Sequence, residues 1–341
     1  MSSSAPPPIL SLHNVSKRYG DFTAVDGISL NIPAGSVYGF LGPNGAGKTT
    51  TIRMILDIIR PTEGDIQILG ASSATAVRNR IGYLPEEKGL YKKMKVWAII
   101  AYFATLKGLS RTRAKNRAYE LLERYGLKDF ANANIESLSK GMGQKVQVLS
   151  AIAHEPELVI LDEPFSGLDP VNQEVLEQLI RDLKDNGQTV IFSTHIMQHA
   201  ERLCERLLLI TQGRKVFDGT VNEARAIIPR RVVLECKNDL TGMCQLDGVL
   251  SVREMSADTE SGPETRLWEL YMREQTDPQL ILQHCFQHQI NLSRFDFTQA
   301  SLHDVFMHLV GPEAREHNFR RNHTRDFSNA RDLTHRLARI P

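Results

Sequence analysis

The sequence predicts an α/β fold with a parallel sheet flanked by helices, followed by a smaller α+β domain. Unbroken apolar runs at 158–161 and 189–192 are typical of strands that are buried on both faces of a parallel sheet. A short apolar run at 36–41 leads into a glycine-rich turn and then a helical pattern. The composition changes after Pro229, which places the start of the second domain there.

Length and charge exclude several classes of protein. A chain of 341 residues suggests about two domains. Because 41 basic residues nearly cancel 40 acidic ones, no general attraction to nucleic acid is expected. The 4 cysteines form no C-x-x-C pair, which is typical of a reduced, intracellular protein. The longest uncharged apolar stretch, 96–106, is shorter than the roughly 18 to 20 residues of a membrane span. Residues 1–8 lack the features of a signal peptide, so a cytoplasmic chain is expected.

The elements of the first domain follow in order after a flexible start at 1–8. Alternating apolar residues predict antiparallel strands over 9–33, with turns at 20–21 and 33–35. A helix is expected over 48–59, ending before Pro61. Residues 96–153 have a helical pattern that is interrupted at Gly108 and Gly126. Residues 206–220 predict a hairpin that turns at Gly213.

The second domain is expected to run as strand, strand, strand, helix, strand, helix over 230–310. Asp277 is expected to begin its first helix, and Ser301 with Asp304 gives the capping signature of its last. The segment 311–341 carries seven arginines and four acidic residues, with few apolar ones. A solvated tail is favoured there over a segment that contacts anionic lipid or RNA.

A phosphate-binding loop is predicted between the strand at 36–41 and the helix that follows. The run Gly42, Pro43, Asn44, Gly45, Ala46, Gly47, Lys48, Thr49 fits G-x-x-x-x-G-K-[ST]. Glycines let backbone N–H groups surround phosphate oxygens, and the helix N-terminus adds the positive end of its dipole. Lys48 is expected to reach the β- and γ-phosphates, and Thr49 is expected to ligate Mg²⁺. A chance glycine-rich turn is the alternative, and the strand–helix context disfavours it.

Two adjacent carboxylates, Asp162 and Glu163, end the apolar strand at 158–161. Ligands of open α/β sheets gather at the carboxyl ends of the strands. Asp162 is therefore expected to belong to the Mg²⁺ shell, and Glu163 to act as general base on the attacking water. An acidic pair in a solvated turn is the alternative, which the upstream phosphate loop disfavours.

Three further motifs complete a family pattern. Residues 138–145 read Leu-Ser-Lys-Gly-Met-Gly-Gln-Lys, residues 166–169 read Ser-Gly-Leu-Asp, and residues 193–195 read Ser-Thr-His. In this order and spacing, residues 9–219 resemble the ATP-binding subunit of an ABC transporter. The resemblance implies a P-loop ATPase core at 9–228 with an antiparallel β subdomain and a helical subdomain at about 86–152. An accessory α+β domain at 229–311 and a basic tail at 312–341 follow.

The same resemblance implies an ATP hydrolase that works as a pair of cassettes sandwiching two ATP molecules, most simply as a homodimer. It implies that Ser139 and Gly141 contact the γ-phosphate held by the other copy, and that Asp169 signals across that interface. It also implies a γ-phosphate contact for His195, stacking of adenine on Tyr19, and a nucleotide contact for Thr50. The expected cofactors are ATP and Mg²⁺. The expected partner is an integral membrane permease, on which the chain sits peripherally at the inner face of the plasma membrane.

Two departures from the family pattern point to one branch. The signature usually reads Leu-Ser-Gly-Gly-Gln, whereas Lys140 and Met142 occupy two of its positions here. Glu86 stands where the loop that senses Mg²⁺ usually has glutamine, and Glu87 is an alternative for that role. Both departures resemble the ATP subunits of ABC-2 type exporters, including those for sodium efflux, and the run 300–306 resembles the last helix of their accessory domain. The resemblance suggests sodium as cargo, and drugs, lipids and polysaccharides are equally open.

The sequence fits other functions less well. A soluble ABC-type regulator of ribosomes or nucleic acid usually has two cassettes or long coiled coils, and this chain shows neither. A non-catalytic scaffold is disfavoured by the intact Lys48 and Glu163. His284 and His288 have the spacing of a metal pair on a helix, but a solvated helix edge is favoured. Two interpretations are equally open for a further set of apolar residues: part of a docking groove for the permease, or ordinary packing at a helix start. These residues are Leu90, Tyr91, Met94 and Trp97.

Overall fold

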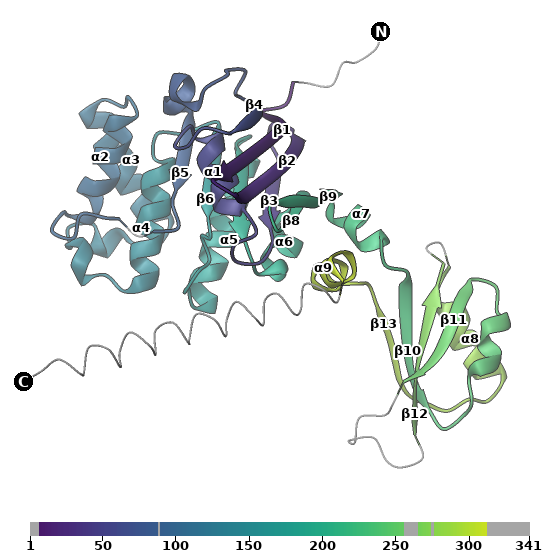
Figure 1. Ribbon diagram of the computed structural model, residues 1–341. Helices are drawn as coiled ribbons and strands as arrows, with labels where there is room; N and C mark the ends of the chain where they lie inside the picture. Colours follow the sequence, from purple (N-terminus) through teal and green to yellow (C-terminus); the bar gives the residue numbers. More distant parts are fainter. Residues whose placement is uncertain (1–6, 88, 256–264, 274–275, 312–341) are drawn as a thin grey trace, which may run out of the picture. The chain divides into compact units, whose positions relative to one another are not determined.

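Six strands form the central sheet of the first part of the chain. The structure is a computed structural model that describes residues 7–87, 89–255, 265–273 and 276–311 (Figure 1). In spatial order the strands are β5 (Ile81–Leu84), β6 (Leu158–Asp162), β7 (Thr189–Thr194), β3 (Val37–Leu41), β8 (Arg206–Thr211) and β9 (Arg214–Thr220). The first five are parallel and β9 is antiparallel, because β8 and β9 form the expected hairpin with Gly213 at its turn. All parallel strands therefore end at one edge of the sheet.

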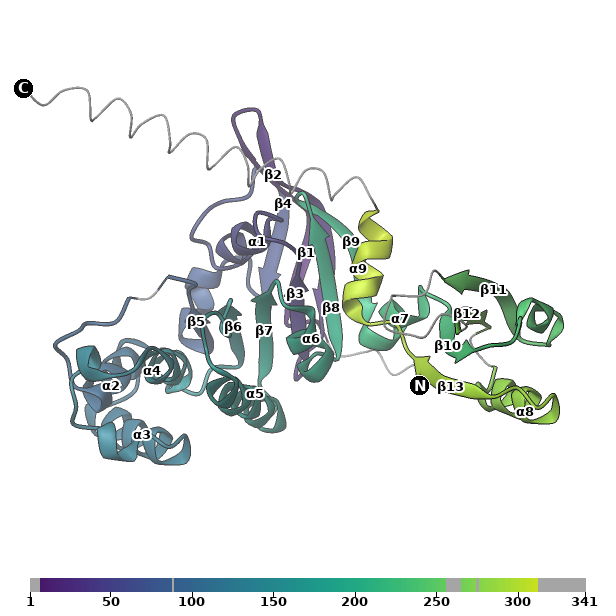
Figure 2. The ribbon, with the colours of Figure 1, turned by 90° about the horizontal axis from the view of Figure 1, so that it is seen from below.

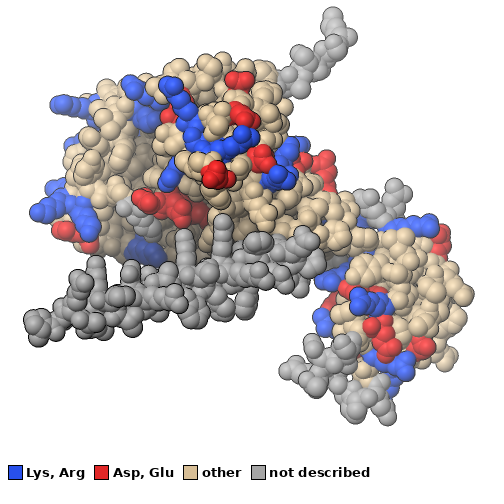
Figure 3. Space-filling model, in the orientation of Figure 1, with Lys and Arg blue, Asp and Glu red and all other residues tan. Residues whose placement is uncertain are grey.

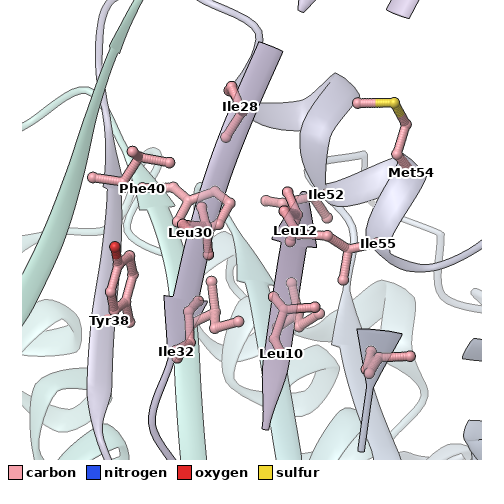
Figure 4. Packing of buried hydrophobic residues seen from close by; sticks show 14 of the residues in the cluster. Leu10, Leu12, Ile28, Leu30, Ile32, Tyr38, Phe40, Ile52, Met54 and Ile55 are labelled. Carbon is pink, nitrogen blue, oxygen red and sulfur yellow. The ribbon is translucent and has the colours of Figure 1, made fainter. Parts of the chain in front are cut away.

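A second sheet and one helix cover one face of the central sheet. The second sheet has the antiparallel order β2 (Phe22–Ile32), β1 (Leu10–Tyr19), β4 (Glu63–Ile68). Its apolar residues, among them Leu12 and Leu30, pack with Phe40 of β3 and Ile52 of α1 (Lys48–Ile55), as Figure 4 shows. Removing this apolar surface from water is the main force that joins the two sheets.

Two helices pack on the other face. Gly39 points away from the Phe40 side of β3, and a Cβ there would lie 2.7 Å from Sγ of Cys204, just after α6 (Met197–Leu203). The helix α5 (Pro170–Asp185) packs against β7. The sheet is thus covered on both faces, as its uninterrupted apolar strands predict (Figure 2).

The helix α1 is shorter than its sequence pattern predicts, since it ends at Ile55 rather than Ile59. Asp57 takes a left-handed conformation with φ of 61°, and the N–H of Ile58 bonds to the carbonyl of Arg53 at 2.9 Å. This contact closes the helix end in the manner of a Schellman motif. Pro61 is therefore not what terminates the helix.

A group of three helices accounts for the expected helical subdomain. These are α2 (Val96–Leu106), α3 (Arg111–Arg124) and α4 (Lys140–Ile152), and α4 also packs against β5. Short 3₁₀ turns occur at η1 (Ala74–Arg80), η2 (Lys128–Phe130) and η3 (Ile135–Ser137). Gly108 and Gly126 follow α2 and α3 with φ of 104° and 73°, as expected for glycines that end helices.

The second part of the chain has its own sheet and core. The antiparallel order is β11 (Val249–Met255), β12 (Arg266–Met272), β10 (Arg230–Cys236), β13 (Leu292–Thr298). The helix α8 (Gln279–Gln287) contributes Ile281 and Cys285 to a core around Trp268. The expected order of elements is confirmed, with α9 (Leu302–Val310) last and a 3₁₀ turn η4 (Thr241–Gln245) added. The capping box of Ser301 and Asp304 is present, whereas α8 starts at Gln279 and Asp277 accepts a 2.9 Å bond from its N–H.

The chain divides into two compact units, Met1–Val221 and Asn222–Pro341. This division falls inside α7 (Val221–Ala226), before the boundary at 228/229 that the sequence suggests. The predicted basic tail at 312–341 lies outside the described residues.

Acidic and basic side chains are interspersed over both units on the face shown in Figure 3. Among the helices in the described part of the chain, none has both the length and the apolarity that a membrane crossing requires.

Candidate functional site

The turn from β3 into α1 has the backbone shape of a phosphate cradle. Gly42 and Gly47 have φ of 156° and 105°. A Cβ on Gly42 would lie 2.1 Å from the carbonyl oxygen of Ile210, and one on Gly47 would lie 2.7 Å from that of Ala24. These positions therefore require glycine, both for conformation and for space. The N-cap Gly47 offers no side-chain hydrogen bond, so the first N–H groups of α1 face the loop.

Lys48 lies within this loop and is almost fully buried. Its Nζ donates to the carbonyl oxygens of Gly42 at 2.7 Å and Pro43 at 3.2 Å. The same Nζ lies 3.3 Å from Oε1 of Glu163. Its ammonium is thus held at the mouth of the loop, where a polyphosphate would approach.

Asp162 ends β6 and is 1% exposed. Its Oδ1 accepts hydrogen bonds from the hydroxyls of Ser193 and of Thr49, the latter at 3.3 Å. Its Oδ2 is buried and has no hydrogen-bond partner among the residues that the structure describes. Burial raises the pKa of Asp162, and the bonds from Ser193 and Thr49 oppose that rise. A divalent cation beside Thr49 would supply the missing partner of Oδ2 and favour the carboxylate, so these residues fit Mg²⁺.

Glu163 bridges two other candidate residues. Its Oε1 lies 3.3 Å from Nζ of Lys48, and its Oε2 lies 3.0 Å from Nδ1 of His195. His195 follows β7, so the carboxyl ends of two neighbouring strands bring the pair together. The carboxylate is 8% exposed while the His195 side chain is 42% exposed. The Glu163 carboxylate is therefore shielded from solvent, whereas the imidazole ring of His195 beside it is exposed and can contact a ligand.

Ser193 is a residue of this site to which the sequence assigns no role. Its hydroxyl donates to Asp162 and accepts the backbone N–H of Glu163 at 2.9 Å. Glu163 itself has φ of 47°, a left-handed conformation that is uncommon for a residue with a side chain. One hydroxyl therefore fixes both carboxylates. Its place two residues before His195, on the strand next to β6, is the signal by which it could have been found.

The signature residues and Asp169 form a second group. Ser139 caps α4 by accepting the N–H of Met142 at 3.3 Å, and Asp169 caps α5 by accepting the N–H of Asn172 at 2.9 Å. The hydrogen bonds that Asp169 accepts from the backbone and side chain of Asn172 lower its pKa. A Cβ on Gly141 would lie 2.5 Å from Nδ2 of Asn172. The two helix starts therefore touch, and Gly141 permits that contact.

Of the remaining predicted residues, Thr50 in α1 is half-buried, and Tyr19, Glu86 and Glu87 are exposed. Tyr19 ends β1, is 51% exposed, and has Nζ of Lys17 5.2 Å from its ring centre. It opposes Phe22 in the β1–β2 hairpin, and Ala24 of β2 touches Gly47. Glu86 and Glu87 are exposed after β5. Tyr83 lies in β5, just before them. Burial is the largest cause that raises its pKa to about 12, and the negative charges of Asp162 and Glu86 add to the rise.

The predicted histidine pair belongs to the second unit of the chain. The ring centres of His284 and His288 lie 4.2 Å apart at the end of α8. Within the described ranges, no three or more histidine, cysteine or acidic side chains are grouped to hold a metal ion. A Mg²⁺ ion at Asp162 would take further ligands from Thr49, phosphate oxygens and water, as is usual for this ion.

Known proteins share both the sequence and the fold of this chain. Residues 25–166 match the family described as ABC transporter. The uncharacterized ABC transporter ATP-binding protein YhaQ of Bacillus subtilis is 40% identical over 304 residues, covering 89% of this chain and 99% of the relative. The Nod factor export ATP-binding protein I of Ralstonia nicotianae is 34% identical, covering 91% and 96%. The linearmycin resistance ATP-binding protein LnrL of Bacillus subtilis is 30% identical, covering 90% and 100%.

Solved structures agree. An ATP-binding subunit of an ABC transporter is 32% identical, with a TM-score of 0.59, covering 64% of this chain and 92% of the other. A dimeric ATP-binding cassette in a post-hydrolysis state, bound to ADP and Pi, is 27% identical, with a TM-score of 0.57, covering 62% and 98%. The relatives of this chain include the ATP-binding subunits of ABC-2 type exporters. Together with the loop, the acidic pair and His195, these similarities show that the chain belongs to the ATP-binding, ATP-hydrolysing subunits of ABC transporters.

Proposed function

We propose that this subunit powers a separately encoded membrane exporter by closing as a dimer around ATP and reopening after hydrolysis. The observation that carries the proposal is the position of Glu163, whose carboxylate joins Lys48 to His195 at the carboxyl edge of the sheet. Lys48 and the N–H groups of α1 bind the phosphates. When bound, Mg²⁺ at Thr49 and Asp162 neutralises phosphate charge. Glu163 accepts the proton of the attacking water, and His195 holds the γ-phosphate.

Binding ATP requires Lys48 to exchange partners. Its ammonium now bonds to the carbonyls of Gly42 and Pro43 and pairs with Glu163. Phosphate oxygens are stronger acceptors for an ammonium than carbonyls are. Drawing Lys48 onto phosphate releases Oε1 of Glu163 for the water. The loop therefore couples arrival of nucleotide to freeing of the base.

We assign the second group of residues to the dimer interface. Ser139, Gly141 and Asp169 lie at the N-termini of two touching helices, whose N–H groups and dipoles favour an anion. A γ-phosphate bound by a second copy is the anion that the family resemblance implies. One relative's structure is dimeric, which supports this arrangement.

An exposed aromatic surface formed by α2 and by Tyr91, which precedes this helix, is our candidate for the permease contact. Tyr91, Tyr102 and Leu106 are 57%, 41% and 60% exposed, and the two tyrosine rings meet edge to face with centres 6.1 Å apart. Trp97 stacks on Tyr119 of α3 at 5.9 Å. An exposed apolar patch of this kind is typical of a protein interface. Attachment there would hold the chain at the inner face of the membrane. Because the named relatives serve Nod factor export and linearmycin resistance, an organic cargo is favoured over sodium.

Glu163→Gln tests the proposed base. The substitution keeps the size of the side chain but removes its basicity, so kcat should fall at least about a hundredfold while ATP still binds. Glu157→Gln is the matched control, since Glu157 precedes β6 at the opposite end of the same strand and pairs with Arg80 at 2.6 Å. Full ATPase activity in Glu163→Gln would remove Glu163 from the mechanism.

Co-purification tests the transporter role. Tagged Glu163→Gln, extracted from membranes with mild detergent in Mg-ATP, should bring down a polytopic membrane protein. Adding Tyr91→Ala and Tyr102→Ala should abolish this capture and leave ATP binding intact. Phe286→Ala, an 83% exposed aromatic of the second unit, is the control. Recovery with ribosomes or nucleic acid alone would instead support the soluble-regulator reading.

A further inference from the structure

A buried carboxylate lies behind the site. Glu177 of α5 is 4% exposed, which is rare for an acidic side chain unless it is paired. Its Oε2 lies 3.1 Å from Nη2 of Arg181. Its Oε1 lies 3.5 Å from Nη1 of Arg202 and 3.5 Å from Nδ1 of His199, both in α6. Glu177 therefore faces α6 and ties two helices together.

His199 connects this carboxylate to the catalytic turn. It is 5% exposed, and its ring stacks on Phe165 with centres 4.1 Å apart and planes 12° apart. Phe165 comes two residues after Glu163, and His199 comes four residues after His195. The segments that carry Glu163 and His195 are thus joined by two contacts. The first is the 3.0 Å contact between Glu163 and His195, and the second is the stack of Phe165 on His199.

The contact between the two buried groups is incomplete. Within the described part of the chain, neither Oε1 of Glu177 nor Nδ1 of His199 has a hydrogen-bond partner, although the two atoms are 3.5 Å apart. The pair is held in place by its other contacts, because the same Oε1 lies 3.5 Å from Nη1 of Arg202 and the His199 ring stacks on Phe165.

We propose that Glu177 and His199 are positioning residues for ATP hydrolysis, which hold the Phe165 turn so that Glu163 and His195 stay aligned. Neither touches nucleotide; both act through the stack on Phe165. Because Asp169 caps the N-terminus of α5, the same pair links the dimer-facing start of that helix to His195. The inference rests on the proposed roles of Glu163 and His195.

The test separates positioning from folding by its kinetic signature. His199→Ala removes the stack, and Glu177→Gln removes the charge while keeping the volume. Each should lower kcat of the full-length chain about tenfold or more, because small misplacements of catalytic groups are costly. KM for ATP and the binding of ATP should change less than about twofold, since Lys48 and the loop are untouched. His199→Phe, which keeps a stacked ring, should recover most of the kcat lost in His199→Ala.

His154→Ala is the matched control. His154 is also buried in the first unit, but it contacts the carbonyl of Ile81 at the start of β5, away from the carboxyl edge. It should lower the melting temperature without lowering kcat per ATP-binding site. The proposal is overturned if His199→Ala keeps its kcat, or if its loss only follows a loss of ATP-binding sites as in an unfolded fraction.

A double variant distinguishes the positioning role of His199 from the proposed role of Glu163 as general base. If His199 acts through Glu163, then His199→Ala should cause no further loss in a Glu163→Gln background. If Glu163→Gln alone is fully active, the assigned base is wrong, whatever His199→Ala does. Equal losses from His199→Ala in both backgrounds would show that His199 acts independently of Glu163, and would overturn the positioning role.

Discussion

Ser193 shows how one hydroxyl can organise two carboxylates. It donates to Oδ1 of Asp162 and accepts the N–H of Glu163, which holds Glu163 in its left-handed conformation. Such a conformation persists only where its surroundings fix it. The side chain that bears the base is therefore aimed by a residue of the neighbouring strand.

Ser193→Ala should lower kcat about tenfold or more, because Asp162 loses a hydrogen bond and the N–H of Glu163 is left buried and unpaired. Steady-state ATPase rates measured over a range of Mg²⁺ concentrations check this, and excess Mg²⁺ should restore only part of the loss. Ser150→Ala is the control, since Ser150 is a buried serine that bonds only within α4, to Val146 at 2.7 Å. Equal rates for the two variants would exclude the role of Ser193.

The sequence predicts the residues of the site better than their supports. Lys48, Asp162 and His195 are recognisable because each lies at or after the carboxyl end of a buried parallel strand, and parallel strands end at one edge. Glu177 and His199 are not recognisable in this way. Their meeting depends on how α5 packs on α6, and neither residue breaks the helical pattern around it.

At the scale of elements, the join between α4 and β5 depends on a neutral histidine. Nε2 of His154 lies 3.1 Å from the carbonyl oxygen of Ile81, which also accepts Nζ of Lys107 at 3.0 Å. Burial, and then the charge of Lys107, lower the pKa of His154 to about 4. The sequence predicts both elements but not this contact, because it joins residues far apart in the chain.

This join should make the first unit sensitive to acid. The unfolded chain binds a proton on His154 below about pH 6.5, while the folded chain does so only near pH 4. The unfolded state therefore binds more protons between these values, and stability falls as the pH is lowered, by up to about 3 kcal/mol. Urea unfolding of wild type and His154→Gln from pH 7.5 to 4.5 measures the effect. The substitution should flatten the pH dependence; parallel curves would assign the acid sensitivity to other groups.

At the scale of the whole molecule, each unit has its own core. The first core lies between the two sheets and α1, and the second surrounds Trp268 beneath α8. The sequence predicts two domains from the change of composition after Pro229. It could not place the division at Val221, because α7 has an ordinary helical pattern and shows no break there.

Two cores and a single nucleotide site predict that ATP stabilises only one of them. The chain has 2 tryptophans, one in each unit: Trp97 in α2, and Trp268, which is 1% exposed. Trp268→Phe leaves Trp97 to report on the first unit, and Trp97→Phe leaves Trp268 to report on the second. With Mg-ATP at about a hundred times its Kd, the first unit should gain about 2.7 kcal/mol, seen as a shift of the Trp97 fluorescence transition in urea. The Trp268 transition should not move, because its core binds no nucleotide. If ATP shifted both transitions equally, the two units would unfold as one cooperative body, and the prediction of independent cores would be wrong.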